Sequence, residues 1–443
     1  MSLKAYHITT MGCQMNAYDS DCLGRTLRES GYQAATAPEE ADLVLINTCA
    51  VREKAEHKAI SLLGRMVSLK KRRPEIILGI MGCVAQKRAQ TLLENYPELD
   101  LVLGTRELGR FPQILGRLEK GERRIAATGL LKDPVPFALN KGFFHNQVRG
   151  FVTIMEGCNN FCSYCVVPYV RGRESSRPPD AVLREVRYLI GEGLKEITLL
   201  GQNVNSYLYK NHEAIAFPHL LRRLQDIDGL RRIRFTTSHP KDLSEELIRC
   251  FRELDKLCSH IHLPFQAGSN RVLKAMNRGY TRERYMELVE KLREKREDMA
   301  VTADVMVGFP GETEEDFLLT IDLINKVRFD GLFSFCYSDR EGTPAQAMKD
   351  KLPEREKLRR LAELQKMQKS ITLENNRKML GREQEVLAEG MSRKGNQLTG
   401  RTSNNKIVNF TSSYNHIGLL FKVKIARAYA NSLWGEDACL IRR

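Results

Sequence analysis

Short apolar runs alternate with longer amphipathic stretches along the first 120 or so residues of the chain. The apolar runs, which are typical of buried strands, cover residues 6–10, 43–47, 76–81 and 101–103. Helical periodicity lies between them, as at residues 19–30, which stop before the turn residue Gly31. Strands that alternate with helices in this way predict an open parallel sheet.

A basic connection at about residues 121–147 precedes a second β/α pattern, which continues to about residue 344. Its strand-like runs cover residues 151–155, 196–200, 232–236, 260–263, 300–307 and 331–337. Helical stretches intervene, for example at residues 180–191 and 244–254. Six β/α steps in about two hundred residues fit a partial (β/α)6 barrel better than a complete eightfold one.

The pattern changes twice after Pro353. First comes a charged helix with a one-sided apolar stripe, formed by Leu358, Leu361, Leu364, Met367 and Ile371. From Gly381 onward, short alternating segments at residues 385–388, 407–410 and 419–428 are separated by Gly, Ser and Asn turns. These segments predict a small all-β barrel of about 60 residues.

The chain is therefore expected to be an α/β protein with three domains, at residues 1–125, 145–375 and 378–443. A length of 443 residues agrees with two or three domains. No stretch approaches the roughly 18–20 apolar residues that cross a bilayer, and the N-terminus lacks the apolar core of a secretion signal. We expect a cytoplasmic protein with no membrane partner.

The chain is strongly basic. A formal net charge of +15 and a pI near 9.3 favour a polyanionic partner, although many basic proteins bind no nucleic acid. From Gly381 to the C-terminus, ten Lys and Arg residues stand against five Asp and Glu residues. The aromatic residues there, Phe410, Tyr414, Phe421 and Trp434, either stack on RNA bases or form the core of the small barrel.

Three cysteines follow the first strand of the second pattern with the spacing Cys-x3-Cys-x2-Cys: Cys158, Cys162 and Cys165. Thiolates hold iron–sulfur clusters, usually four to a cubane, whereas a zinc site prefers a fourth Cys or His. Three ligands in a loop after a strand, where α/β enzymes keep their chemistry, predict a 4Fe–4S cluster with one open iron. The alternative is a tight loop that happens to be rich in cysteine.

A second set of cysteines follows three different strands of the N-terminal sheet: Cys13, Cys49 and Cys83. The carboxyl ends of neighbouring parallel strands meet at one edge, so these thiols can meet there and hold a second cluster. The alternative is that they are small buried hydrophobic residues. The remaining cysteines share no geometry and are interpreted as structural: Cys22, Cys250, Cys258, Cys336 and Cys439.

The Cys158/Cys162/Cys165 loop resembles the cluster loop of the radical S-adenosylmethionine (SAM) superfamily. The resemblance implies that SAM chelates the open iron and is cleaved to methionine and a 5′-deoxyadenosyl radical. It also implies that the aromatic residue before the last cysteine, Tyr164, packs near the adenine.

The segments at residues 12–16, 47–49 and 82–83 resemble the N-terminal motifs of the methylthiotransferase family, and the resemblance covers the whole chain. It implies an N-terminal cluster domain, a radical SAM barrel and a C-terminal barrel of the TRAM type. It also implies two 4Fe–4S clusters, of which the one on Cys13, Cys49 and Cys83 carries the sulfur and is methylated by a first SAM.

Within that family, the motifs at residues 12–16, 166–172 and 201–205 are similar to the MiaB-type branch. This implies methylthiolation at C2 of N6-isopentenyladenosine at position 37 in a tRNA anticodon stem-loop. It further implies an electron donor and proteins that supply sulfur or clusters. Alternatives are a threonylcarbamoyl-adenosine in tRNA, an aspartate of a ribosomal protein, or an iron–sulfur RNA-binding redox sensor without enzymatic activity.

Residues after the barrel strands are candidates for contact with SAM: Gly201, Gln202, Ser238, Gln266, Asp304 and Gly308. Glycine permits a close approach of the backbone to a ligand, although a plain turn explains Gly201 equally well. His239 is interpreted as more often structural than catalytic. Thr313 suits a helix N-cap, and the partners of Arg171 and Arg173 are left open between RNA phosphate and the SAM carboxylate. No catalytic residue is assigned.

Overall fold

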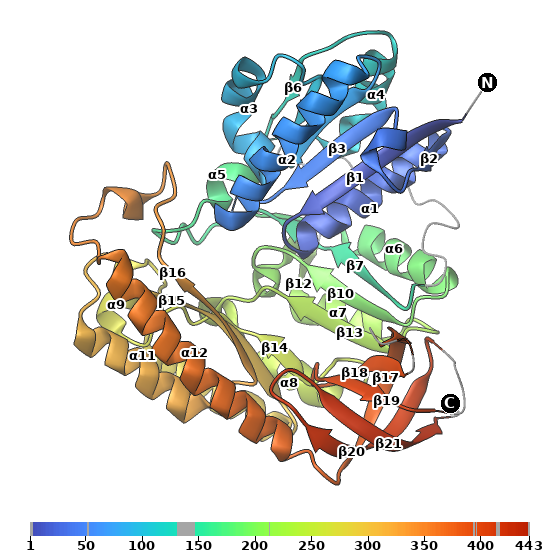
Figure 1. Cartoon of the computed structure of the whole chain (residues 1–443). Helices are drawn as coiled ribbons and strands as arrows, with labels where there is room; N and C mark the ends of the chain where they lie inside the picture. Colours follow the sequence, from blue (N-terminus) through green and yellow to red (C-terminus); the bar gives the residue numbers. More distant parts are fainter. Residues whose placement is uncertain are drawn as a thin grey trace. The chain divides into compact units, whose positions relative to one another are not determined.

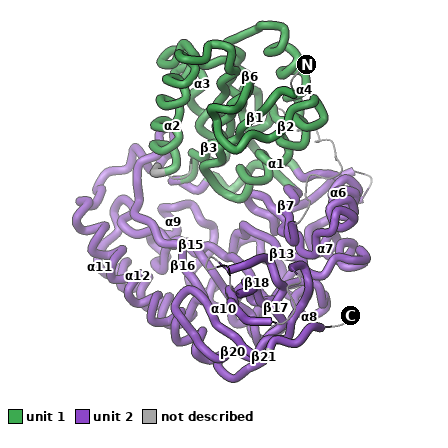
Figure 2. The backbone as a smooth tube through the Cα atoms, turned by 45° about the vertical axis from the view of Figure 1, so that its right-hand side comes forward, with its two compact units in different colours: residues 1–143, 155–161, 165–175 green, residues 144–154, 162–164, 176–443 purple. Residues whose placement is uncertain are grey.

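The structure is a computed structural model that describes residues 3–50, 53–130, 147–211, 213–392, 395, 397–412 and 417–441 (Figure 1). Its contacts divide the chain into two compact units, shown in different colours in Figure 2. Unit 1 comprises residues 1–143, 155–161 and 165–175, and unit 2 comprises residues 144–154, 162–164 and 176–443. Among the described residues, no helix has the length and apolar character needed to cross a membrane.

Unit 1 is built on a six-stranded parallel sheet, as the alternating pattern predicts. Its strands, in spatial order, are β2 (Tyr32–Ala34), β1 (Lys4–Met11), β3 (Leu43–Thr48), β4 (Ile77–Gly82), β5 (Leu101–Leu103) and β6 (Ile125–Ala127). The edge strands β2 and β6 were not predicted, because each has only one buried residue, whereas the equally short β5 is buried throughout and reads as an apolar run. The expected connection is described only at its ends, since residues 131–146 lie outside the described part.

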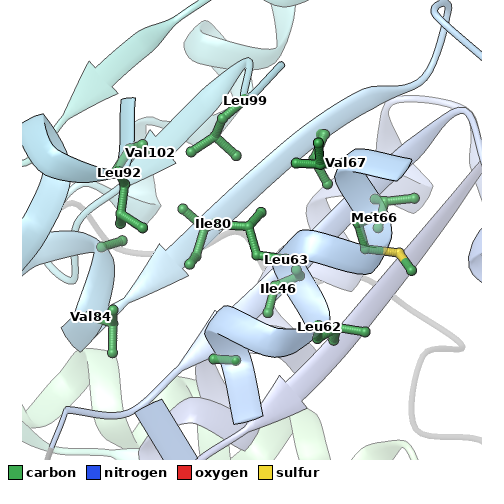
Figure 3. Close-up of a cluster of buried hydrophobic side chains, with 14 of the residues drawn as sticks. Ile46, Leu62, Leu63, Met66, Val67, Ile80, Val84, Leu92, Leu99 and Val102 are labelled. Atoms are coloured by element: carbon green, nitrogen blue, oxygen red, sulfur yellow. The ribbon is translucent and has the colours of Figure 1, made fainter. Parts of the chain in front are cut away.

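Helices cover both faces of this sheet. They are α1 (Gln14–Glu29), α2 (Glu53–Arg72), α3 (Cys83–Asn95), α4 (Phe111–Glu119) and α5 (Val167–Arg171). Ile46 and Ile80 pack with Leu63 and Val67 in one core (Figure 3), and a separate cluster contains Leu23 of α1. Every residue of β3 and β4 is buried, which explains why these strands read as continuous apolar runs.

Unit 2 contains the six predicted strands of a partial barrel. They form two parallel sheets, β7 (Arg149–Thr153), β10 (Glu196–Leu200) and β13 (Arg232–Thr236), then β14 (His260–His262), β15 (Ala300–Val307) and β16 (Gly331–Cys336). A parallel bridge between Ile233 and Leu257 joins the sheets where β13 meets the approach to β14. The partial barrel is thus confirmed.

The helices of unit 2 follow the strands in β/α order. They are α6 (Pro179–Gly191), α7 (Phe217–Gln225), α8 (Glu245–Glu253), α9 (Asn270–Ala275), α10 (Arg282–Lys295), α11 (Glu314–Val327) and α12 (Glu354–Arg377). A hairpin, β11 (Leu208–Lys210) and β12 (Ala214–Ala216), is inserted after β10, and β8 (Met155–Glu156) and β9 (Ser175–Ser176) flank the cysteine loop in sequence.

Helix α12 packs on β16 and β15, as Figure 1 shows. Leu364 and Ile371 are buried there, but Leu358, which the apolar stripe placed on the same face, is 53% exposed. The stripe prediction was therefore wrong at Leu358, because this turn of the helix buries Arg360 instead, which is 4% exposed.

The C-terminal segment forms the closed barrel that the short alternating runs predicted. Its strands run in the order β17 (Glu383–Met391), β18 (Leu398–Thr402), β19 (Ile407–Phe410), β21 (Leu433–Leu440) and β20 (Leu420–Ala428). Phe410 and Phe421 lie in its core, with ring centroids 5.3 Å apart. These two aromatic residues are core residues and are not available to stack on RNA, whereas Tyr414 lies outside the described residues.

Candidate functional site

The carboxyl edge of the unit 1 sheet carries Cys13, Cys49 and Cys83, which lie within two residues of the ends of the adjacent strands β1, β3 and β4. Cys13 is the N-cap of α1, and Cys83 is the first residue of α3. The Cys49 amide donates to the Met11 carbonyl at 3.1 Å, which ties the end of β3 to the end of β1. Cys49 and Cys83 are buried, whereas Cys13 is exposed. Sheet topology therefore does what the strand pattern predicted and brings the three cysteines to one edge.

Two buried asparagines hold the backbone that presents these thiols. The Asn16 side chain accepts a hydrogen bond from the Cys13 amide at 3.1 Å and donates to Asn47 at 2.9 Å and to the Thr48 carbonyl at 3.1 Å. Asn47 returns a hydrogen bond to the Asn16 carbonyl at 2.8 Å. This pair locks the Cys13 and Cys49 loops to each other, which gives the residues around the cysteines in both motifs a physical role.

Gly82 sets the direction of the third cysteine. Its φ is +90°, and a Cβ atom at this position would lie 2.4 Å from the Thr48 carbonyl oxygen. Any larger residue would meet both a strained backbone and a steric clash at this point. The glycine before Cys83 is therefore required for β3 and β4 to approach each other where the thiols emerge.

A buried cation lies beside these thiols. Arg171 of α5 donates to Asp19 at 2.9 Å and lies 3.7 Å from a carboxylate oxygen of Glu156. A hydrogen bond with Cys49, together with the charge of Arg171, lowers the pKa of the Cys13 thiol to about 5. Burial raises the pKa of the Cys83 thiol, and the nearby charge of Arg171 opposes that rise.

The position of Arg171 shows whether its guanidinium is available to RNA. The residue is 2% exposed and paired within unit 1, so its guanidinium is not displayed to an RNA phosphate. Burial raises the pKa of its partner Asp19 to about 7, although the ion pair with Arg171 acts in the opposite direction. Arg173, in contrast, is exposed, with its guanidinium carbon 5.2 Å from the centre of the Phe161 ring.

The donor set at this edge fits an iron–sulfur cluster. Ligand cysteines must be thiolates, and both the hydrogen bond to Cys13 and the nearby guanidinium favour that form. Among the described residues, no three His, Cys, Asp or Glu side chains gather as tightly as one metal ion requires. Cysteine thiolates are the ligands that hold iron–sulfur clusters, so the chemistry of this donor set fits one.

The second triplet lies in the loop between β8 and α5. Cys158 and Cys165 belong to unit 1 and Cys162 belongs to unit 2. Within unit 1, the Cys158 amide donates to the Gly172 carbonyl at 3.1 Å. The preceding residue, Gly157, has a φ of +80°, and a Cβ atom there would lie 2.1 Å from a backbone oxygen, so this turn also requires glycine.

Within unit 2, the Cys162 end of the loop is fixed to the segment after α9. The Ser163 amide donates to the Met276 carbonyl at 3.0 Å, and its hydroxyl donates to the Ala275 carbonyl at 2.9 Å. Cys162 is 7% exposed, and its sulfur accepts a hydrogen bond from Arg278 at 3.4 Å. The same guanidinium lies 3.5 Å from the Tyr164 hydroxyl.

Arg278 was not recognised in the sequence. It lies between α9 and α10, where the pattern of hydrophobic positions indicates only a turn. A single arginine at such a position carries no periodicity, and its function depends on residues more than 100 positions earlier in the chain. No pattern in one sequence could have identified it.

Two candidate SAM-contact regions follow β10 and β13 at the carboxyl end of the barrel strands. Gly201 is buried and Gln202 is half-buried directly after β10. Ser238, two residues after β13, is 3% exposed, and its hydroxyl has no hydrogen-bond partner within the described structure. A buried hydroxyl without a partner costs free energy, so Ser238 is suited to a bound polar ligand.

His239 beside it is held by two hydrogen bonds, and its buried Nε2 has no hydrogen-bond partner among the described residues. Its amide donates to the Asn205 side chain at 2.9 Å, and its Nδ1 accepts from the Lys241 amide at 3.2 Å. Its ring meets the Tyr280 ring edge-on at 5.6 Å. Burial lowers the pKa of His239 to about 2, so the imidazole is neutral throughout the physiological range.

Gln266 and Asp304 are coupled through their backbones. The Gln266 amide donates to the Asp304 carbonyl at 3.0 Å, and its carbonyl accepts from Met306 at 2.9 Å. Gln266 has a φ of +67° in this bridge to β15. Asp304 lies inside β15, and its carboxylate is 3.5 Å from Nε2 of His262. These backbone hydrogen bonds place Gln266 beside the second half of β15, which contains Asp304.

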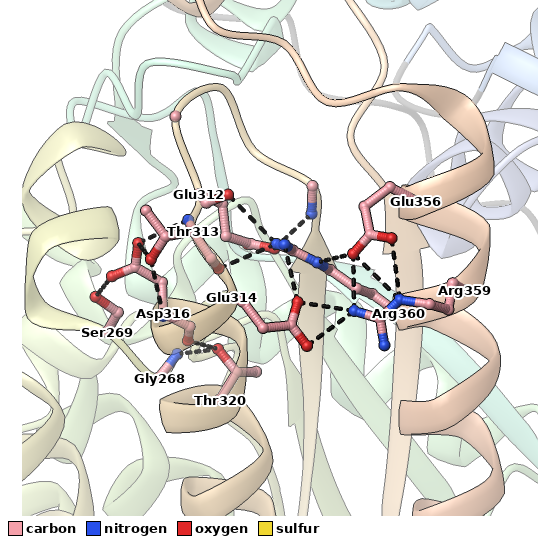
Figure 4. Close-up of polar contacts among 12 residues, drawn as sticks. Gly268, Ser269, Glu312, Thr313, Glu314, Asp316, Thr320, Glu356, Arg359 and Arg360 are labelled. Atoms are coloured by element: carbon pink, nitrogen blue, oxygen red, sulfur yellow. Dashed lines mark hydrogen bonds and ion pairs between the residues drawn. The ribbon is translucent and has the colours of Figure 1, made fainter.

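Gly308 directly follows β15, with a φ of +72°. Its amide donates to the Glu312 carboxylate at 2.9 Å, and Arg360 of α12 pairs with the same carboxylate at 2.7 Å (Figure 4). Burial raises the pKa of Glu312. Thr313 caps α11, as the sequence predicted, and also forms a capping box with Asp316. The loop after β15 is therefore fixed by a buried ion pair.

Three families match successive parts of the chain. Residues 5–104 match the uncharacterized protein family UPF0004, residues 152–324 match the radical SAM superfamily, and residues 377–436 match the TRAM domain. These ranges fall on the N-terminal sheet, the partial barrel and the closed β-barrel.

Similar proteins extend over almost the whole chain. The tRNA-2-methylthio-N(6)-dimethylallyladenosine synthase of Syntrophus aciditrophicus (strain SB) is 50% identical over 98% of this chain and 95% of its own length. The protein of the same name from Geobacter metallireducens is 49% identical over 98% of each chain.

Solved structures with a similar fold have low sequence identity. The radical SAM methyltransferase TsrM from Kitasatospora setae has a TM-score of 0.58 and 15% identity, covering 78% of this chain and 77% of TsrM. At such identity the likeness shows the fold alone.

Proposed function

The chain belongs to the family of tRNA-2-methylthio-N(6)-dimethylallyladenosine synthases, within the radical SAM superfamily, and from this premise we propose how its residues share the reaction. The reaction is methylthiolation at C2 of N6-isopentenyladenosine in tRNA, and it uses SAM and a 4Fe–4S cluster. The site proposed for this chemistry consists of two sets of three cysteines.

Cys158, Cys162 and Cys165 are proposed to hold the cluster that binds SAM. Cys13, Cys49 and Cys83 are proposed to hold a second 4Fe–4S cluster that carries the sulfur to be transferred. When bound, the first cluster and SAM supply a carbon radical by one-electron cleavage of SAM. A radical is needed because the aromatic C–H bond at C2 resists acid–base chemistry. The protein supplies position and excludes water.

The convergence of Cys13, Cys49 and Cys83 on one sheet edge carries the two-cluster proposal. A structural role does not require three thiols after three adjacent strands, nor does it require asparagine and glycine residues that fix their loops. Arg171 supports the proposal because a cation beside thiolates offsets part of the cost of gathering negative charge in a buried place. In this reading Arg171 stabilises the ligands, with Asp19 and Glu156 holding its orientation.

The SAM-contact residues remain proposals of the same kind. Ser238 is proposed to offer its hydroxyl to a polar group of SAM. Gly201 and Gln202 are proposed to approach the amino group, and Gln266 to reach the ribose. A further group is proposed to line the adenine: Tyr164, Asp304 and Gly308.

The tRNA is proposed to bind by its anticodon stem-loop, because an unpaired base in a loop can be turned out of the stack at a low cost in free energy. Trp434 and Arg427 of the TRAM barrel are candidates for RNA contact, since the guanidinium lies 5.0 Å from the centre of the indole ring. We also propose a cytoplasmic location, where thiols stay reduced. The reaction further requires a one-electron donor and proteins that supply sulfur or clusters.

Reconstituted protein tests this proposal. It should hold about eight irons per chain if both clusters are cubanes. With reductant, SAM and isopentenylated tRNA, it should yield 5′-deoxyadenosine and the 2-methylthio nucleoside. Cys13→Ala, Cys49→Ala and Cys83→Ala should each keep SAM cleavage and lose the methylthio product. A variant that still made this product would refute the sulfur-donor assignment, and a redox sensor would release no 5′-deoxyadenosine.

A further inference from the structure

We propose that Arg278 is a positioning residue for the SAM-binding cluster. Its guanidinium acts through the Cys162 sulfur and raises the reduction potential of the cluster, and it also positions Tyr164 on the side of the site where the adenine of SAM binds. The inference rests on the proposed function only in placing this cluster on Cys158, Cys162 and Cys165.

Arg278 is a buried cation, with 5% of its surface exposed. Its Nη2 donates to the Pro264 carbonyl at 2.8 Å, its Nε donates to the Tyr280 hydroxyl at 3.2 Å, and its Nη1 points to Cys162 and Tyr164. The Tyr280 hydroxyl in turn donates to the Phe265 carbonyl at 2.8 Å. The guanidinium is therefore held in place from three sides.

Arg278 lacks the partner that a buried arginine normally has. Within the described residues, it forms no ion pair with an Asp or Glu, and the groups that raise its pKa are the phenols of Tyr280 and Tyr164 and the Cys162 thiol. A buried charge without a counter-charge is costly. A cysteine that ligates a cluster is a thiolate, so Cys162 supplies the missing negative charge once the cluster is bound.

Hydrogen bonds to the sulfurs are one of the terms that set a cluster's reduction potential. Reduction adds one electron, and the added negative charge is stabilised by a nearby cation, more strongly in a buried site than in water. SAM cleavage depends on that electron. The position of Arg278 therefore favours the reduced state, which the first step of the reaction requires.

A purely structural role is the rival interpretation, because the same guanidinium also holds the Pro264 carbonyl and Tyr280. A reduction potential separates the two, since support of the loop alone does not change the charge near the cluster. Tyr280→Phe provides the matched control, as it removes a loop contact and leaves Arg278 beside Cys162.

The parent for the test carries Cys13→Ala, Cys49→Ala and Cys83→Ala, so that only one cluster contributes to the spectra. Its reduction is followed by EPR during a redox titration. Arg278→Gln should shift the one-electron equilibrium toward the oxidised cluster at least tenfold, which corresponds to about 59 mV. Arg278→Lys, which keeps the charge, and Tyr280→Phe should each stay within about threefold of the parent. Equal potentials for Arg278→Gln and the parent would overturn the proposal, as would an equal shift in Tyr280→Phe.

A second measurement detects the contact between Arg278 and the cluster in protein that keeps Arg278. Parent protein labelled with 15N in its arginine side chains should show 15N hyperfine coupling to the reduced cluster, and Arg278→Lys should remove it. Absence of that coupling in the parent refutes the contact, even if Arg278→Gln cannot hold iron. The iron content and 5′-deoxyadenosine release of the parent report separately on the proposed function. A parent without iron overturns the cluster placement and the role of Arg278 with it, whereas a parent with a cluster whose potential is unchanged in Arg278→Gln overturns the role of Arg278 alone.

Discussion

The small barrel is fastened to the partial barrel by buried arginines, and breaking one of these contacts should have a large and specific cost. Arg234 of β13 lies 3.0 Å from the Glu196 carboxylate, with side-chain exposures of 7% and 1%. It also donates to the carbonyls of Thr402 and Ser403 in the small barrel at 2.8 and 2.9 Å. Arg234→Met would leave a buried carboxylate alone and remove both donors.

Breaking a buried pair in this way costs about 3–5 kcal/mol. Glu196→Gln should cost less, about 2 kcal/mol, because Arg234 keeps its two carbonyl acceptors. The double variant carries no buried charge at this position, so its cost should fall below the sum of the two by at least about 2 kcal/mol.

Urea unfolding followed by tryptophan fluorescence can measure this coupling directly. The chain has a single tryptophan, Trp434, and it lies in β21 of the small barrel, so the signal reports on that module. Arg231→Met, at an exposed position three residues earlier, is the matched control and should change stability by less than about 0.5 kcal/mol. Additive costs for Arg234→Met and Glu196→Gln would refute the buried-pair reasoning.

Three further changes test other parts of the account. Gly82→Ala places a Cβ atom 2.4 Å from a backbone oxygen, so the reconstituted variant should hold about four irons instead of about eight. Gly64→Ala, in open space on α2, is the control and should keep all the irons in a colorimetric iron assay. Burial lowers the pKa of His239 to about 2, so below pH 6.5 the unfolded chain binds a proton at this residue and the folded protein does not. The free energy of unfolding should therefore fall by about 1.4 kcal/mol per pH unit from pH 6.5 downward. Urea titrations of His239→Gln should lack this pH dependence. Arg427→Gln should weaken tRNA binding and reduce the salt slope by about one, and an unchanged slope would exclude a phosphate contact at Arg427 beside Trp434.

Much of the scaffold is readable from the sequence because buried parallel strands are continuous apolar runs. β10, β13 and β15 begin and end where the pattern predicts, and the cysteines after β1, β3 and β4 follow from strand order. The short edge strands and the bulged strands of the small barrel carry a weaker alternation. β20 pairs irregularly with β21, and both β18 and β21 were missed altogether.

The polar residues behind the site were far harder to predict. Arg171 stood in a recognised motif, yet its partner Asp19 is 152 residues away in the chain. Arg278 contacts Cys162 across 116 residues, and nothing in its own segment distinguishes it from a turn. Such side chains act through long-range burial and charge, which depend on the completed fold and not on local periodicity.

This chain attaches a methylthio group to isopentenylated adenosine in tRNA. Mass spectrometry of tRNA nucleosides from cells with and without the gene tests it most directly. We predict that the 2-methylthio-N6-isopentenyladenosine signal disappears without the gene, that the unmodified isopentenyladenosine accumulates, and that the wild-type gene restores the signal while Cys158→Ala and Cys83→Ala do not. An unchanged nucleoside profile in cells without the gene would contradict the account.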